Sequence, residues 1–253
     1  MSSPLSRRTF LAQTALAATT ALAAPALFTQ AAPSGQRNIR KAIMYATVGV
    51  KGSVLEKFQQ CKAAGFEGVE AMSHMKQDEV LAARDATGLT IPSVCGSKHW
   101  DKPLSHPKES VREEGLQALL QTLKDAHAYG AKSVLLVPGV VNKEVSYAEC
   151  YQRSQEQIRK ALPLAQDLKV KIAIENVWNN FLLSPLEAAR YLEEFNSPWV
   201  AWHFDIGNVI TYGWPEQWIH ILGKRIATLH IKEFSREKSR EEGLGKGFNV
   251  EFL

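Results

Sequence analysis

The chain has 253 residues, of which 45% are hydrophobic and 22% are charged, and this composition is typical of a globular protein with one large domain. Its formal net charge of +4 falls to +2 when Arg7 and Arg8 are set aside, and Lys and Arg alternate with Glu along the expected helices. So small a basic excess argues against a nucleic-acid partner.

The first 32 residues contain the three parts of an export signal. SRRTFL at Ser6–Leu11 supplies a basic start, an Ala-, Thr- and Leu-rich run reaches Ala24, and small residues occupy Ala24-Pro25-Ala26. The paired arginines resemble a twin-arginine translocation signal, so we expect residues 1–32 to direct export, for example to the periplasm. The apolar run falls short of the roughly 18–20 strongly apolar residues of a membrane helix, so we expect no stable span.

From residue 41 onward, strand patterns and helix patterns alternate with a period of about 30 residues, which is the length of a strand-helix unit. Ser53 and Ser184 are typical helix N-caps, and Gly65 is a typical helix stop. The expected strands span 42–48, 66–72, 90–97, 131–141, 170–177, 199–208 and 226–234. The expected helices span 53–65, 77–88, 109–130, 146–169, 184–195 and 214–223.

Seven such units predict an α/β fold with a parallel sheet, either a closed barrel or a doubly wound sheet. No GxGxxG motif follows the first strand, and the count favours a (β/α)8 TIM barrel. We expect a charged loop at 235–247, and we expect the last six residues to approach an eighth strand without forming it. The expected barrel domain, 38–253, therefore lacks its eighth β/α unit, and we expect the chain to be C-terminally truncated and weakly active or inactive in that form.

Polar residues interrupt the carboxyl ends of several expected strands, where the side chains of a parallel barrel converge. Glu175 ends the fifth strand, Asp205 the sixth and His230 the seventh. Two carboxylates and one imidazole are ligands suited to Mn²⁺, Mg²⁺, Co²⁺ or Zn²⁺. The sequence therefore predicts a divalent metal site at Glu175, Asp205 and His230. The alternative for His230 alone is a core histidine with satisfied hydrogen bonds.

Three segments, IENVWNNFLLSP (174–185), HFDIGNVITYGWPEQWI (203–219) and RIATLHIKEF (225–234), resemble the sugar phosphate isomerase/epimerase group of xylose-isomerase-like TIM barrels. The likeness runs from about Lys41 to Leu253 and is nearest to the exported subgroup with twin-arginine signals. It implies one divalent metal held by Glu, Asp, His and a second Glu on strands five to eight. By position the first three are Glu175, Asp205 and His230, and the only late candidate for the fourth is Glu251.

The resemblance also implies substrate contacts. Arg236 matches an arginine that holds substrate oxygens, and Asn208 stands where these epimerases often carry a histidine. HIKE at 230–233 replaces the more common HIKD. Further candidates for sugar contacts are the strand-end residues Glu70, His99 and Lys232 and the aromatic residues Trp178 and Phe181, each of which has a structural role as its alternative.

These residues predict a metal-dependent sugar or sugar phosphate isomerase or epimerase that acts through an enediolate, with Glu175 as ligand and acid/base. Export favours a free sugar or a polyol-derived ketone over a phosphate. The alternative is a non-catalytic sugar-binding or degenerate barrel. The sequence does not distinguish a homo-oligomer from a monomer. A nuclease like endonuclease IV needs further histidines where this chain has Val137 and Asn208, which argues against it.

Overall fold

The structure, a computed structural model, describes residues 39–243. The chain divides into two compact units, Met1–Ile39 and Arg40–Leu253, and the described strands and helices all belong to the second. The expected signal at 1–32, residues 244–247 of the expected charged loop and the last six residues, with Glu251, lie outside the described residues, so the predicted boundaries at 32 and 38 stay predictions. None of the helices within residues 39–243 has the length and hydropathy of a bilayer-spanning segment.

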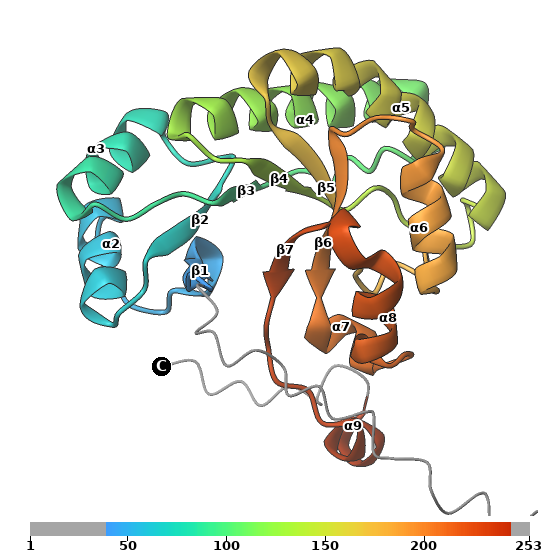
Figure 1. The fold of residues 1–253 in the computed structure, drawn as a ribbon. Coiled ribbons are helices and arrows are strands. Elements are labelled where there is room, and N and C mark those ends of the chain that lie inside the picture. The colour runs from blue at the N-terminus through green and yellow to red at the C-terminus, as the bar shows by residue number, and fades with distance from the viewer. Residues whose placement is uncertain (1–38, 244–253) are drawn as a thin grey trace, which may run out of the picture. The chain divides into compact units, whose positions relative to one another are not determined.

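Seven parallel strands form one sheet and follow one another in chain order, which confirms the predicted α/β barrel arrangement for this part of the chain. Figure 1 shows the strands following a curve, with the longer helices on its outer side. The strands are β1 (Ala42–Met44), β2 (Gly68–Met72), β3 (Ser93–Cys95), β4 (Ser133–Leu136), β5 (Lys171–Glu175), β6 (Val200–Asp205) and β7 (Ile226–His230).

Three of the outer helices begin at a serine whose side chain caps the helix. Ser53 and Ser146 each form a capping box with the Glu three residues later, and Ser184 caps a helix that starts with Pro185. The helices of this layer are α2 (Val54–Ala63), α3 (Gln77–Thr87), α4 (Glu109–Tyr129), α5 (Tyr147–Leu168), α6 (Pro185–Glu193) and α8 (Pro215–Leu222).

Three predicted segments differ from the structure. The first strand ends at Met44 and gives way to a 3₁₀ turn, η2 (Tyr45–Thr47). The sixth ends at Asp205, whose side chain caps a short helix, α7 (Ile206–Ile210). The predicted charged loop contains a helix, α9 (Arg236–Glu242), because the Ser235 hydroxyl accepts a hydrogen bond from the amide of Lys238 and so caps its start. A 3₁₀ turn, η3 (Gly223–Arg225), leads into β7.

The alternation of side chains along β5 separates the hydrophobic core from the functional end. Ile172 and Ile174 are fully buried in the core cluster shared with the helices. Glu175 follows Ile174 and projects from the opposite face of the strand, because successive strand residues point in opposite directions. Glu175 is thus placed inside the curve of the sheet.

A register shift between β6 and β7 decides which residue of β7 faces Asp205. Trp202 pairs with Ile226, but the next residue, His203, pairs with Thr228. The extra residue on β7 brings His230, rather than Leu229, opposite Asp205. A one-residue shift reverses the face that each side chain occupies, so this irregularity turns His230 toward the carboxylates.

Asn176 joins the carboxyl ends of β5 and β6. Its side-chain amide donates to the carbonyl of Asp205 at 2.7 Å, and its side-chain oxygen accepts from the amide of Asp205 and from Nε1 of Trp202, both at 3.0 Å. Only 1% of Asn176 is exposed. The Asn176 side chain therefore provides hydrogen-bond partners for three buried polar groups.

We expect Asn176→Ala to lower the free energy of unfolding by about 2–4 kcal/mol, because it leaves buried donors and an acceptor without partners. Urea denaturation followed by tryptophan fluorescence measures the change. Gln117→Ala, at an exposed position of α4, is the matched control and should change stability little. Equal stabilities of the two variants would show that the network contributes nothing.

Candidate metal centre

Glu175, Asp205 and His230 meet at the carboxyl ends of three adjacent strands. Nδ1 of His230 lies 3.3 Å from Oε1 of Glu175 and 3.8 Å from Oδ2 of Asp205. One ligand atom from each residue lies within 4.8 Å of the other two. The structure thus brings together the three residues that the sequence predicts as metal ligands.

The carboxylates of this cluster are buried. Glu175 is 9% exposed and Asp205 is 0% exposed. Burial is the largest influence on Glu175 and raises its pKa above the ordinary value, against the opposing effect of His230. Burial would lower the pKa of His230, but its contacts with Glu175 and Glu70 outweigh this and raise it to about 10. His230 therefore carries a proton and a positive charge at neutral pH when no metal is bound.

The two oxygens of Asp205 have different surroundings. Oδ1 accepts a hydrogen bond from the amide of Asn208 at 2.7 Å. Oδ2 is buried and accepts no well-directed hydrogen bond from the described residues, although Nζ of Lys232 lies 2.8 Å away. Lys232 reaches this position over Gly207, where a Cβ atom would lie 2.5 Å from Cγ of Lys232. One oxygen is thus fixed by the backbone, and the other faces the cluster.

These observations fit a divalent cation. Ligand bonds of about 2.1 Å to N and O atoms place neighbouring ligands roughly 3 Å apart, close to the distances found around Nδ1 of His230. Oδ2 of Asp205 is buried beside the ammonium of Lys232 and accepts no well-directed hydrogen bond from the described residues. A cation bound to this oxygen would compensate its charge. Two carboxylates and one imidazole also match the ligands of Mn²⁺, Co²⁺ and Zn²⁺.

Three of the predicted sugar contacts lie beside this cluster. Lys232 pairs with Asp205, and Asn208 is 7% exposed. The side-chain amide of Asn208 donates to the carbonyl of Asn176 at 2.8 Å, so it supports the backbone instead of pointing into the cluster. Trp178 is 37% exposed, donates from Nε1 to the carbonyl of Asn208 and meets Phe234 edge to face.

The other predicted sugar contacts have different neighbours. Glu70 is buried, and both of its oxygens are hydrogen-bonded, to Ser93 and His230. Burial lowers the pKa of His99 to about 4, and its Nδ1 accepts from the amide of Val137. Phe181 is buried in an aromatic cluster with Tyr147, Tyr151 and Tyr191. These three side chains have partners within the protein, and their predicted roles toward a sugar stay predictions.

Arg236 holds the α7–α8 connection. Its Nε donates to the carbonyl of Ile210 at 2.7 Å, a second nitrogen donates to the carbonyl of Gly213 at 2.5 Å, and the guanidinium lies 4.5 Å from the ring centre of Trp214. The contacts of Arg236 are thus with the polypeptide, and its predicted role toward substrate oxygens stays a prediction.

Sequence reasoning missed three residues around the cluster: Asn176, His203 and Ser93. His203 shares a strand face with Asp205, and that two-residue spacing was the available signal. It is 1% exposed, and burial lowers the pKa of its imidazole to about 3, so the ring is neutral. Ser93 lies on β3 and had no signal in the sequence, because only the fold brings its hydroxyl to Glu70.

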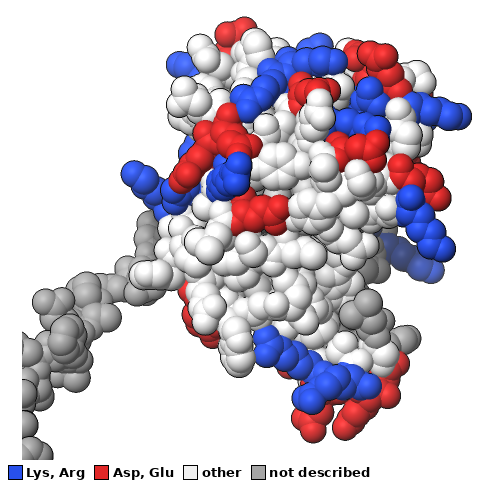
Figure 2. Space-filling view, turned by 90° about the vertical axis from the view of Figure 1, so that its right-hand side faces the viewer, with Lys and Arg blue, Asp and Glu red and all other residues white. Residues whose placement is uncertain are grey.

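The charged surface carries both signs. On the face drawn in Figure 2, Lys and Arg lie among Asp and Glu, and no continuous basic stripe crosses the view.

Comparison with known proteins agrees with the fold. The family model described as "Xylose isomerase-like TIM barrel" matches residues 58–253. Among curated proteins, L-ribulose-5-phosphate 3-epimerase UlaE of Escherichia coli O1:K1 is 26% identical over 208 residues, covering 76% of this chain and 73% of its own. UlaE of Escherichia fergusonii is equally similar. These relatives are sugar epimerases, enzymes of the isomerase class.

Solved structures with the same fold have lower identity. The apo form of 3-keto-D-glucoside 4-epimerase YcjR from E. coli matches with a TM-score of 0.70 at 20% identity, covering 79% of this chain and 81% of that one. A D-psicose 3-epimerase in the presence of D-fructose matches with a TM-score of 0.65 at 19% identity, covering 76% and 72%. With the family model matching most of its length, the chain belongs to the family of xylose isomerase-like TIM barrels.

Proposed function

We propose that this protein is a divalent-metal-dependent isomerase that acts on a sugar or a sugar phosphate, most simply as a ketose epimerase. The observation that carries the proposal is the convergence of Glu175, Asp205 and His230 at adjacent strand ends. The named relatives support it, because a ketose 3-epimerase and a 3-keto-glucoside 4-epimerase both invert a carbon next to a ketone.

Glu175, Asp205 and His230 would hold the ion, which when bound supplies a Lewis acid to polarise the substrate carbonyl. The Glu175 carboxylate removes the proton from the carbon beside that carbonyl, and the substrate becomes an enediolate. Where that carbon is C3, return of a proton to it on the opposite face gives the C3 epimer; where it is C1, delivery of the proton to the former carbonyl carbon, C2, gives the aldose. Burial raises the pKa of Glu175 above its ordinary value, which makes its carboxylate a stronger base toward the substrate C–H.

Lys232 supplies positive charge next to the same cluster. Its ammonium lies 2.8 Å from Oδ2 of Asp205, the oxygen that faces the cluster. If the proposed ion is held at this oxygen, the Lys232 ammonium would be repelled from it and could then donate to a hydroxyl or carbonyl oxygen of the substrate. Lys232 thereby links metal binding to substrate binding.

Export through the twin-arginine pathway is part of the proposal, and it is supported by SRRTFL and the apolar run that comes after it. An exported enzyme meets free sugars and polyol-derived ketones more often than phosphorylated ones, so a free ketose is the substrate class that we propose first.

We expect the rate at which the chain with Mn²⁺ exchanges a ketose C–H proton for deuterium in D₂O to fall in Glu175→Gln, by about 10²–10⁴-fold where the wild-type rate is high enough to measure such a loss. NMR of a panel of ketoses and ketose phosphates measures exchange and epimerisation together. Glu156→Gln, at an exposed position of α5, is the matched control. Sugar binding without exchange in the wild type would favour the alternative of a non-catalytic sugar-binding barrel.

We expect metal affinity to rise with pH, by about tenfold per unit between pH 6 and 8, because the ion must replace a proton on His230 whose pKa is raised to about 10. Isothermal titration with Mn²⁺ in buffers that do not bind metal measures the slope. Affinity that stays constant across this range would contradict an ion at His230.

We expect Lys232→Met to tighten Mn²⁺ binding by about tenfold, because it removes a positive charge that lies 2.8 Å from Oδ2 of Asp205, a proposed ligand atom. The same variant should raise KM for the ketose. Lys224→Met, at an exposed position of η3, controls for a general change in charge. Weaker Mn²⁺ binding by Lys232→Met would show that the lysine supports Asp205 instead of competing with the ion.

A further inference from the structure

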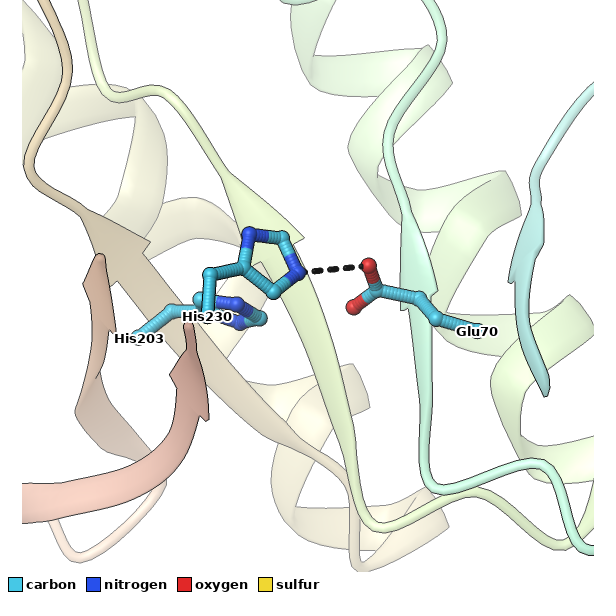
Figure 3. Close-up of side chains that lie close together, drawn as sticks. All are labelled: Glu70, His203 and His230. Carbon is cyan, nitrogen blue, oxygen red and sulfur yellow. Dashed lines mark hydrogen bonds and ion pairs between the residues drawn. The ribbon is translucent and has the colours of Figure 1, made fainter. Parts of the chain in front are cut away.

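A second group of ligand-type residues adjoins the proposed metal centre and shares His230 with it. Glu70, His203 and His230 place one ligand atom each within 4.8 Å of the others. Figure 3 shows the Glu70 carboxylate pointing at the ring of His230, with the His203 ring close by. This group could either hold a second ion or orient the ligand of the first, and the contacts of His230 distinguish the two roles.

The two nitrogens of His230 face different carboxylates. Nε2 lies 2.9 Å from Oε2 of Glu70, and Nδ1 lies 3.3 Å from Oε1 of Glu175. A neutral imidazole has one nitrogen that donates and one that accepts a proton or binds a metal. A carboxylate that accepts from Nε2 therefore leaves the lone pair on Nδ1, which is the nitrogen that faces Glu175 and Asp205.

Glu70 is itself held in place. It is 4% exposed, and Ser93 on the neighbouring strand donates a short hydrogen bond to its Oε1. Oε2 is thereby directed at His230, which lies on β7 and is 160 residues away in sequence. A buried carboxylate with one oxygen on a hydroxyl and the other on an imidazole has the arrangement that orients metal-bound histidines in other proteins.

His203 packs against the same ring without competing for its proton. The two ring centres are 4.1 Å apart at an interplanar angle of 74°. Neither nitrogen of His203 has a hydrogen-bond partner among the described residues. An ion held by Nε2 together with the first ion at Nδ1 would require His230 to give up both of its protons, so occupation of both positions is unfavourable.

We propose that Glu70 is a positioning residue that fixes His230 with its proton on Nε2 and presents Nδ1 to the ion. The inference rests on the proposed metal centre and adds to it the ligand atom and the residue that selects it. This role differs from the sugar contact that the sequence predicts for Glu70, because Glu70 would act on the metal through His230.

The test compares the wild type with Glu70→Ala, with Glu70→Gln and with Glu79→Ala at an exposed position of α3. Zn²⁺ affinity by isothermal titration should fall about 10–100-fold for Glu70→Ala and by less for Glu70→Gln, which keeps the volume and one acceptor. Glu79→Ala should bind as the wild type does. Circular dichroism checks that each variant is folded. If Glu70→Ala does not fold, the comparison of Glu70→Gln with the wild type still tests the proposal.

A second measurement separates orientation from simple packing. In ¹H–¹⁵N spectra of histidine-labelled protein with saturating Zn²⁺, His230 of the wild type should show a protonated Nε2 and a metal-bound Nδ1, assigned by their loss in His230→Ala. Glu70→Gln should weaken or broaden the Nε2 proton signal, a change that loss of packing alone does not produce.

Three outcomes would overturn the inference. Unchanged Zn²⁺ affinity and an unchanged Nε2 proton in Glu70→Gln and Glu70→Ala would show that Glu70 does not select the nitrogen. Two ions per chain, with one lost in His203→Phe, would show a second metal site. A wild type that binds no divalent ion would contradict the proposed function as well. Failure of the proposed function is thus distinguished from failure of the role of Glu70 alone.

Discussion

Three carboxylates buried around one imidazole are the constraint on which the functional end of this protein depends. Glu70, Glu175 and Asp205 are each at most 9% exposed, and His230 contacts all three. Like charges so close and so little hydrated require positive charge among them. The proton on His230 and the ammonium of Lys232 supply that charge in the structure, and a divalent cation supplies more of it in the proposed enzyme.

The backbone around this cluster holds the charges at fixed positions. The register shift between β6 and β7 turns His230 toward Asp205, and Asn176 ties the carboxyl ends of β5 and β6 together. Gly207 leaves room for the stem of Lys232 beside Asp205. Asn176 and Gly207 lie just after the carboxyl ends of β5 and β6, which is where parallel barrels collect their catalytic side chains.

The family and the site support the proposed function in different ways. Membership among the xylose isomerase-like TIM barrels rests on the match over residues 58–253. The relatives' names share one kind of chemistry, inversion of a carbon next to a ketone, and the Glu, Asp and His cluster suits that chemistry whichever ketose is bound.

The sequence by itself determined the alternation of strands and helices, the parallel barrel and the identity of Glu175, Asp205 and His230 as candidate ligands. These come from local patterns, since each of the three strands ends at the residue whose polar side chain interrupts an apolar run. Only the tertiary structure decided that Glu70 faces His230, that Asn176 bridges two strands and that α9 comes after β7. Glu70 and His230 are 160 positions apart in sequence, and Asn176 and Asp205 are 29 apart. The position of His230 also depends on a one-residue shift in strand pairing. Periodicity along the chain does not predict such contacts or the shift, because both depend on how strands that are distant in sequence align.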